Sequence, residues 1–480
     1  MSKNFYITTT LPYVNAPAHM GHALEFVRAD IIARYKKLIG FDVFLNTGTD
    51  EHGQKILEKA LAAGKTPQEY TDFYAGKFKE LLKLLNILPE ANFIRTTDKN
   101  HIKTAQEFWH VCDQNGYIYK KIYQTKYCVG CELEKTDSDL INGCCPDHSN
   151  LKIELRDEEN YFFKFSEFQK PLLKFYKKNP NFVIPDFRFK EIKTFVEAGL
   201  QDFSISRLKE KMPWGIEVPG DSDHIMYVWF DALVNYISAI GWPTDIDKFN
   251  KWQVSTGGMV QYCGKDNLRQ QTAMWQAMLM AAGLPNSRTV VIDGFVTGAG
   301  GVKMSKSLGN GIDPVEILDA YGTDVLRYYV ARELHPFEDT PMTMEMVKEA
   351  YNANLANGLG NLVSRIMKMA ETNLSTPVTI TEKNIPSEFI DLLEKFEIQK
   401  ATDLIWQKIA EADRYIQETT PFKLIKIDKE KGIEIIKDLV MHLYVISQML
   451  GPIMPETSER IENLIKSNKS PENPLFLRKD

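Results

Sequence analysis

The chain of 480 residues is too long for one compact core and predicts two or three domains. Its longest apolar run, Met278 to Leu284, is far too short to cross a bilayer, and no signal-peptide pattern opens the chain, so we expect a cytoplasmic protein with no membrane contact. A net charge of −6 excludes nucleic-acid binding through bulk charge alone, so any RNA contact must use local patches.

The first predicted unit is a strand followed by a helix. The β-branched run Phe5 to Thr10 predicts the strand, and apolar residues spaced by three and four from Leu24 to Leu38 predict the helix. His19, Gly21 and His22 therefore stand at a helix N-terminus, where backbone N–H groups and the helix dipole favour a phosphate. By itself this stretch is equally compatible with two surface histidines near a turn.

A second strand, Phe41 to Asn46, leads to Asp50 and then to a helical stretch. Strand, helix and strand in this order predict a parallel sheet that binds its ligand at the carboxyl ends of the strands. Asp50 follows such an end, so it is either the N-cap of the next helix or a ligand-binding carboxylate.

Cysteines cluster after a strand-like run at Tyr117 to Tyr123, in the pattern Cys128-x2-Cys131-x13-Cys145-x2-His148. Two short-spaced ligand pairs suit a tetrahedral structural zinc in a reducing compartment. Cys144 is the alternative to Cys145, which we prefer because Pro146 and Asp147 complete the two-residue spacing to His148. Buried or idle cysteines are the remaining interpretation.

The middle of the chain is mixed. We expect Asn160 to Lys211 to continue the segment that begins near Gly116 and interrupts the parallel sheet. The sheet should resume near Trp214. Trp229, Ala232 and Tyr236 then share one helical face, which is either plain core or an aromatic lining suited to a flexible thioether.

A second polyphosphate motif follows the apolar run Thr289 to Val296. It is Lys303-Met304-Ser305-Lys306-Ser307, on a glycine-rich loop before a helix start at Asp313-Pro314. Two lysines and two serines suit a mobile clamp on phosphates, although lysines on loops are usually only solvated.

From Glu333 the pattern becomes helical. Three long helical stretches are predicted: Met344 to Glu371, Glu388 to Glu418 and Lys431 to Leu450. They predict an α-helical bundle as a separate domain.

The histidine and lysine motifs, in this order and each after a strand, resemble the paired nucleotide-binding motifs of class I aminoacyl-tRNA synthetases. With the flanking residues, the resemblance is to the methionyl-tRNA synthetase family and covers nearly the whole chain. It implies an α/β fold: a Rossmann-type parallel-sheet catalytic domain split by a zinc-knuckle insertion, then an α-helical anticodon-binding bundle. The implied domains are 1–115 and 214–332 for the catalytic halves, 116–213 for the insertion and 333–480 for the bundle.

The resemblance also implies activation of methionine by ATP and its transfer to tRNA. The catalytic residues would be His19, His22, Lys303 and Lys306, and the ATP site would use Gly21, Glu217, Gly264, Asp266, Met304, Ser305 and Ser307. Methionine would contact Thr10, Leu11, Tyr13, Asp50, Trp229, Ala232, Tyr236, Gln271 and Trp275. Asn361, Arg365 and Phe422 would read the anticodon.

The implied cofactors are ATP with Mg²⁺ and one structural Zn²⁺ per chain, and the implied partner is tRNA(Met) with a CAU anticodon. A monomer is expected, since the chain stops near Asp480 without the extra domain that dimerises some relatives. Three residues depart from the family pattern: Gln271 for His, Leu233 for Pro and Phe422 for Trp.

Three other functions compete. The leucine, isoleucine and valine enzymes are much longer and carry an editing domain. A non-catalytic tRNA-binding protein would not need intact histidine and lysine motifs. A nucleotidylyltransferase of the same fold would not need the helical domain.

Overall fold

The computed structural model describes residues 3–128, 133–135, 140–141, 143–146, 152–302, 311–380 and 385–479. Its centre is a six-stranded parallel sheet of order β3-β2-β1-β12-β13-β7. The strands are β1 Lys3–Thr9, β2 Phe41–Thr49, β3 Asn92–Arg95, β7 Val183–Ile184, β12 Val260–Gly264 and β13 Thr289–Asp293. The predicted parallel sheet is confirmed.

Alternating side chains on β1 build two separate cores. Phe5 and Ile7 join the cluster under α1, whereas Tyr6 joins the cluster on the opposite face, as the two-residue period of a strand requires. The first face carries α1 Met20–Leu38 and α3 Pro67–Leu84, which α2 Gln54–Ala62 precedes. The second carries α4 Lys99–Gln114, α5 Gln169–Lys178, α6 Asp186–Glu197, α7 Val228–Ala232, α8 Asn235–Ser238, α9 Ile246–Phe249 and α10 Trp275–Ala281.

The strand order reverses between β1 and β12. On one side of this point the next strands in the sheet are β2 and then β3, and on the other side β12 is followed by β13. Connections leave in opposite directions at such a switch point, which opens a crevice at the carboxyl ends of the two strands.

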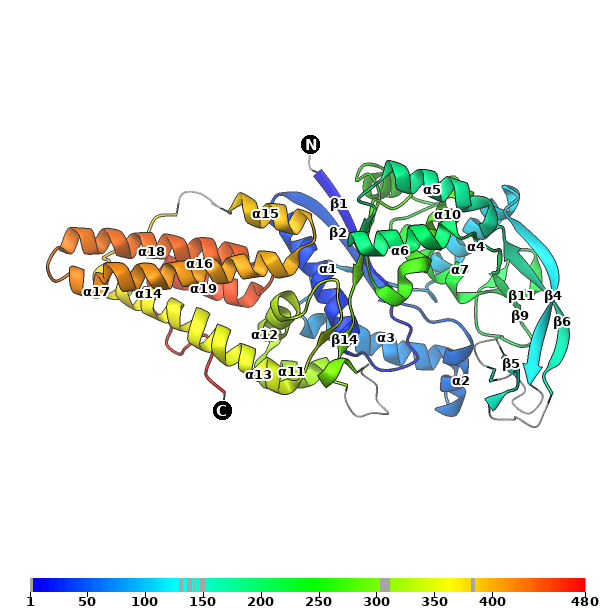
Figure 1. Cartoon of the computed structure of the whole chain (residues 1–480), viewed down its shortest axis with the longest axis horizontal. Coiled ribbons are helices and arrows are strands. Elements are labelled where there is room, and N and C mark those ends of the chain that lie inside the picture. The colour runs from blue at the N-terminus through cyan, green and yellow to red at the C-terminus, as the bar shows by residue number, and fades with distance from the viewer. Residues whose placement is uncertain are drawn as a thin grey trace.

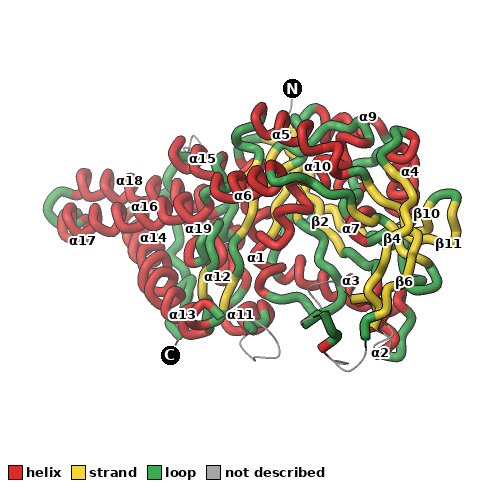
Figure 2. The backbone as a smooth tube through the Cα atoms, turned by 45° about the vertical axis from the view of Figure 1, so that its right-hand side comes forward, coloured by secondary structure: helices red, strands yellow, loops and turns green. Residues whose placement is uncertain are grey.

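Residues 118–226 contain two small antiparallel sheets beside α4 (Figure 2). One contains β4 Ile118–Cys128, β5 Leu133–Lys135, β6 Glu154–Phe163 and β8 Phe203–Ser204, and the other contains β9 Ser206–Leu208, β10 Glu217–Val218 and β11 Asp221–Met226.

Two expectations for this region need correction. The main sheet does not resume near Trp214, because β10 and β11 pair with β9 and the next main-sheet strand is β12. In addition, β7 belongs to the sequence region assigned to the insertion but pairs with β13 at the edge of the main sheet. Pairing with distant strands determines where the two-residue strands β7 and β10 lie, and their own sequences do not predict it.

The helical bundle projects from one end of the α/β body (Figure 1). Its helices are α13 Met344–Ala350, α14 Asn361–Asn373, α15 Ser387–Glu394, α16 Ile398–Thr419, α17 Pro421–Leu424, α18 Lys429–Leu450 and α19 Pro455–Ser467, and the π-helical turn Tyr351–Gly360 joins α13 to α14. The predicted bundle is confirmed, and α17 and α19 were not expected. Before it come α11 Pro314–Tyr321 and α12 Thr323–Tyr328, and β14 Val296–Thr297 pairs with β15 Thr340–Pro341.

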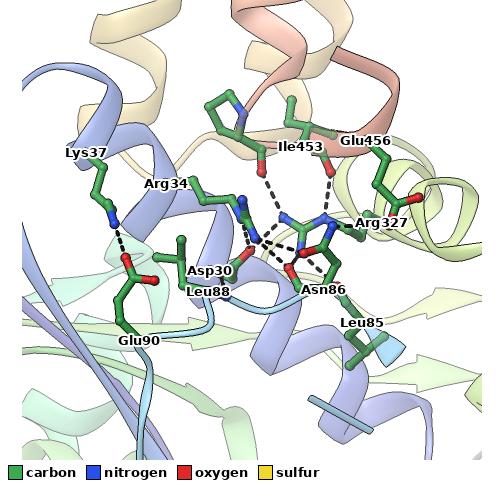
Figure 3. A network of polar contacts seen from close by, with 11 residues as sticks. Asp30, Arg34, Lys37, Leu85, Asn86, Leu88, Glu90, Arg327, Ile453 and Glu456 are labelled. Carbon is green, nitrogen blue, oxygen red and sulfur yellow. Dashed lines mark hydrogen bonds and ion pairs between the residues drawn. The ribbon is translucent and has the colours of Figure 1, made fainter. Parts of the chain in front are cut away.

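A buried arginine joins the bundle to the α/β body (Figure 3). Arg327 on α12 pairs with Asp30 on α1 at 2.7 Å, and both side chains are fully buried. Its remaining N–H groups donate to the carbonyls of Ile453 and Pro452 in the α18–α19 turn, at 2.8 and 2.9 Å, and to that of Leu85 after α3, at 3.1 Å. One guanidinium therefore bonds to both domains. None of the described helices is both long and apolar enough to cross a membrane.

Candidate active site

A cleft of about 1660 Å³ opens at the switch point. Its walls include the residues that follow four strands of the main sheet: Thr10 after β1, Asp50 after β2, Gly264 at the end of β12 and Gly294 after β13. The N-terminus of α1 and the α7–α8 segment complete it. The predicted ligand position at the carboxyl ends of the strands therefore coincides with the large cavity.

Two histidines cap the N-terminus of α1. His19 is the N-cap residue, and its Nδ1 accepts the Gly21 N–H at 3.1 Å. The Nδ1 of His22 accepts the His19 N–H at 3.2 Å, and the two rings stack with centroids 3.8 Å apart. A methyl group on Gly21 would lie 2.9 Å from the His19 ring, so the cap requires glycine there.

The caps determine where these rings carry their protons. A ring nitrogen that accepts a backbone N–H must be unprotonated, so the neutral form of each ring has its proton on Nε2. Burial, with His19 beside it, lowers the pKa of His22 well below the usual 6.5. His22 is therefore a neutral hydrogen-bond donor at pH 7, and both histidines line the cleft.

Lys303, Met304, Ser305, Lys306 and Ser307 lie outside the described residues. The residues on either side are described, and Gly301 before the gap and Gly311 and Asp313 after it all line the cleft. The expected start of α11 is confirmed, since Asp313 accepts the Val315 N–H at 2.9 Å and Pro314 occupies the first helical position.

Eight of the nine residues expected to contact methionine line the cleft: Thr10, Leu11, Tyr13, Asp50, Trp229, Ala232, Tyr236 and Gln271. Trp275 is not among the lining residues. It is fully buried behind Tyr236, with the two rings 5.8 Å apart. Leu233, which departs from the family pattern, is buried and also reaches the cleft wall.

In the part of the chain that the structure describes, Asp50 has one carboxylate oxygen without a partner, although the backbone N–H groups of His52 and Glu51 bond to its carboxylate. It does not cap α2, because Gly53 occupies that N-cap position. Its Oδ1 is buried and has no hydrogen-bond partner among the described residues. Burial first, and then the charges of Asp231 and Glu51, raise its pKa well above 3.8. A partly buried carboxylate that faces a cleft in this way is suited to a cationic group on a ligand.

Only some of the described residues expected to bind ATP line the cleft. Gly264 and Asp266 line the cleft, and a methyl group on Gly264 would lie 2.8 Å from Asp266 Oδ1. Glu217 does not line it. Its side chain is 54% exposed on β10 and pairs with Lys209 at 2.5 Å, because β10 belongs to a small antiparallel sheet. The expected contact of Glu217 with ATP stays a prediction, which this position does not support.

Two carboxyl groups in the cleft were not predicted. Glu25, three residues after His22, accepts the Thr10 N–H at 2.5 Å, and its pKa is raised well above 4.5 by burial and by Asp293. Asp293, at the end of β13, pairs with buried Arg28 at 3.1 Å, yet burial raises its pKa to about 6. The three-residue spacing from His22 and the position at a strand end were the available indications.

The expected zinc ligands are described only in part. Cys131 and His148 lie outside the described residues, and within the described ranges no group of three metal-binding side chains is assembled. Cys128 and Cys145 are both buried, whereas Cys144 is only partly buried. Reciprocal backbone hydrogen bonds of 2.9 and 3.0 Å between Ile141 and Cys144 close a tight turn just before Cys145.

The anticodon candidates lie on the bundle, outside the cleft. Asn361 is exposed near the start of α14, and Arg365, one turn later, forms an ion pair with Asp413 of α16. Phe422 on α17 is 47% exposed. Thr420, with a φ of 40°, redirects the chain between α16 and α17.

Comparison with known proteins agrees with this geometry. The family model described as tRNA synthetases class I (M) matches residues 5–152 and 147–367, so the fold and its cleft are those of a class I aminoacyl-tRNA synthetase. The methionine–tRNA ligase of Thermotoga maritima is 40% identical over 97% of this chain and 76% of its own length. That of Nostoc sp. is 38% identical over 96% of this chain and 89% of its own length. The chain belongs to the methionyl-tRNA synthetase family.

Solved structures support the same assignment. Mycobacterium tuberculosis methionyl-tRNA synthetase in complex with methionyl-adenylate has a TM-score of 0.84 at 32% identity, covering 96% of this chain and 93% of that one. Its apo form has a TM-score of 0.80 at 28% identity, covering 100% and 99%.

Proposed function

We propose that the chain is a methionine–tRNA ligase. It activates methionine with ATP to methionyl-adenylate and then transfers the methionyl group to the 3′-terminal ribose of tRNA(Met). The observation that carries the proposal is the cleft itself. One cavity contains a histidine pair at a helix N-terminus and, against an aromatic wall, a carboxylate with a buried, unpartnered oxygen.

Activation places methionine and ATP at the two ends of this cleft. A methionine carboxylate oxygen attacks the α-phosphorus, a new P–O bond forms, and the bond to the pyrophosphate oxygen breaks. The Nε2–H groups of His19 and His22 donate to phosphate oxygens as negative charge shifts onto the leaving group. Asp50 pairs with the methionine ammonium group, and the thioether packs among Leu11, Trp229 and Tyr236.

Transfer uses the same cleft. A hydroxyl of the terminal ribose attacks the methionyl carbonyl carbon, the bond to the adenylate oxygen breaks, and AMP leaves while the hydroxyl proton is released. Positioning accounts for most of the acceleration of such a step.

The remaining assignments extend the proposal. Lys303 and Lys306 steady the pyrophosphate, Mg²⁺ accompanies the ATP phosphates, and Asp266 binds the ribose. Cys128, Cys131, Cys145 and His148 hold one structural zinc. This donor set suits zinc, and the burial of Cys145 beside an exposed turn favours it over Cys144.

The proposed domain division follows the expected boundaries, with catalytic halves 1–115 and 214–332, insertion 116–213 and bundle 333–480. The bundle reads the CAU anticodon through Asn361, Arg365 and Phe422. The enzyme is cytoplasmic and monomeric, and light scattering of the full chain tests its oligomeric state.

ATP–pyrophosphate exchange with each of the twenty amino acids tests the function. Exchange that depends on methionine, followed by charging of a CAU-anticodon tRNA, is the expected result. Exchange driven by a different amino acid would reassign the substrate. Absence of exchange with all twenty would leave only a binding role.

A further inference from the structure

A carboxylate in the cleft wall bonds to two other segments of that wall. Asp339, which precedes β15, accepts the Phe295 N–H on Oδ1 at 3.0 Å. Lys265, in the turn after β12, donates to both oxygens of the same carboxylate, at 2.8 and 2.6 Å. All three residues line the cleft. Asp339 therefore joins the turn after β12 and the link between β13 and β14 to the chain that leads into the bundle.

The backbone around Asp339 is held against the end of β13. The Phe295 carbonyl accepts the Thr340 N–H at 3.0 Å, so Phe295 is bonded to this segment through both of its backbone groups. The backbones of Gly294 and Glu338 approach so closely that a methyl group on Gly294 would meet the Glu338 carbonyl. The position of the Asp339 carboxylate therefore follows from the main chain and does not require its ion pair with Lys265.

Lys265 is held on another side by an aromatic ring. Its ammonium group lies 4.4 Å from the centre of the Phe295 ring, within the range of a cation–π contact. The Lys265 side chain is 26% exposed and that of Asp339 is 42% exposed, so their ion pair is partly solvated and adds little to folding stability. Its consequence is a single position for a long, flexible side chain in the cleft wall.

The residue after Lys265 is the carboxylate expected to bind the ribose. Asp266 is exposed and lines the cleft, and among the described residues its carboxylate receives a side-chain hydrogen bond only from the Asn267 amide, at 3.3 Å. A lysine released from Asp339 would have Asp266, its neighbour in the same turn, as an alternative partner. An ammonium group on Asp266 would occupy the lone pairs that ribose hydroxyl groups need.

We propose that Asp339 is a positioning residue for ATP: it holds Lys265 against Phe295 and so leaves Asp266 free to accept the ribose hydroxyl groups. The proposal rests on the proposed function, in which Asp266 binds the ribose. In this arrangement the effect of Asp339 on ATP passes through the Lys265 side chain.

The test compares ATP with 2′-deoxy-ATP in methionine-dependent pyrophosphate exchange, because the two differ in one ribose hydroxyl group. The measured quantity is the ratio of kcat/KM for ATP to that for 2′-deoxy-ATP, which should exceed one in wild type. Asp339→Asn keeps an acceptor for the Phe295 N–H but loses the charge that holds Lys265. It should lower the ratio about three- to tenfold, the effect of one weakened hydrogen bond, through a higher KM for ATP and with kcat nearly unchanged.

A double variant separates this role from a purely structural one. Lys265→Met keeps an apolar side chain beside Phe295 and removes the ammonium group. Alone it should leave the ratio near that of wild type, and added to Asp339→Asn it should restore the ratio. An ion pair that only shapes the turn would give the opposite result, because Lys265→Met would lower the ratio as Asp339→Asn does and the double variant would not recover.

Asp42→Asn is the matched control. Asp42 lies near the start of β2, at the opposite end of the strand from the cleft, and its ion pair with Lys251 has a length of 2.7 Å. Its side chain is 46% exposed, close to the value for Asp339. Loss of this ion pair should leave the ratio unchanged.

Asp339→Ser, whose hydroxyl can also accept the Phe295 N–H, replaces Asp339→Asn if that variant does not fold. An unchanged ratio in the Asp339 variant, or failure of Lys265→Met to restore it, would overturn the role of Asp339. A wild-type ratio of one would overturn the ribose contact of Asp266 on which that role depends. Wild-type protein that lacks methionine-dependent exchange would instead refute the proposed function.

Discussion

The cleft and the surface of the bundle present their polar groups in different ways. In the cleft, hydrogen bonds within the protein set the orientation of polar groups, as in the histidine caps of α1. On the bundle, Asn361 and Phe422 are exposed and Arg365 is paired with Asp413. A small substrate is recognised by preoriented dipoles, whereas RNA bases are recognised by stacking that forms on binding.

The proposed zinc site tests whether the insertion supports the tRNA-dependent step or the chemistry in the cleft. Cys145→Ser should abolish zinc binding, because a structural site needs all four ligands, while Cys144→Ser should retain one zinc per chain. Metal analysis of the purified variants measures this. In Cys145→Ser the tRNA-dependent step should weaken and exchange should persist. Zinc-free wild-type protein, or loss of zinc only in Cys144→Ser, would refute the assignment.

His22→Ala tests the cleft alone. Loss of one donor to the charge that develops on the phosphates should lower methionine-dependent exchange by about 10²–10³-fold, with a much smaller change in methionine affinity. Charging of tRNA should fall by a similar factor.

The same substitution removes a helix cap, so a matched control is needed. Thr343→Ala removes the cap of α13, where the side chain accepts the Met346 N–H at 3.2 Å, and should leave exchange unchanged. Normal exchange in His22→Ala would mean that the phosphates bind elsewhere.

Phe422→Ala tests the bundle alone. Stacking of one base on an aromatic ring is worth about 1–3 kcal/mol, so charging of a CAU-anticodon tRNA should fall about ten- to a hundredfold. Phe422→Trp should be tolerated, and exchange should be normal in both variants.

Phe187→Ala is the control for Phe422, since Phe187 is also exposed, at 45%, but lies on α6. If Phe422→Ala and Arg365→Ala both charge the tRNA normally, the bundle does not read the anticodon. The bundle surface would then not bind RNA bases by stacking, as the comparison with the cleft assumes.

Asp50→Asn gives the smallest effect and concerns stability. The pKa of Asp50 is higher in the folded protein than the ordinary 3.8, so above pH 3.8 the folded state holds the proton more tightly than the unfolded state. Stability therefore falls as the pH rises from 3.8 through the folded pKa, and the loss is complete at higher pH.

The asparagine variant avoids this loss. It should be more stable than wild type at neutral pH, by about 0.5–2 kcal/mol, while binding methionine more weakly. Denaturant unfolding at pH 7 and at pH 3.5 measures the difference, which should vanish at the lower pH. A variant less stable than wild type at pH 7 would refute this destabilisation by burial.

Sequence reasoning recovered the parts of the fold that local chemistry determines. The first strand, the first helix and the start of α11 follow from hydrophobic periodicity and capping residues. It failed where distant pairing decides: β7 is two residues long and joins the main sheet, and β10 carries Glu217 away from the cleft.

In the candidate site, too, the sequence predicted some residues and missed others. His19, Asp50 and Tyr236 could be found because motif and strand position place them in the cleft. Glu25 and Asp293 were missed because single carboxylates on a helix or at a strand end are common and usually solvated.

The hydrogen bonds of buried Arg327 have a consequence for how the molecule unfolds. Separating the bundle from the α/β body would break its bonds to the carbonyls of Ile453 and Pro452, at about 1.5–3 kcal/mol for each hydrogen bond to a charged group, and would also split a hydrophobic core that runs continuously from Phe5 to Leu475. Heat should therefore melt both domains in a single calorimetric transition, and ligand that tightens the cleft should raise the melting temperature of the bundle with it.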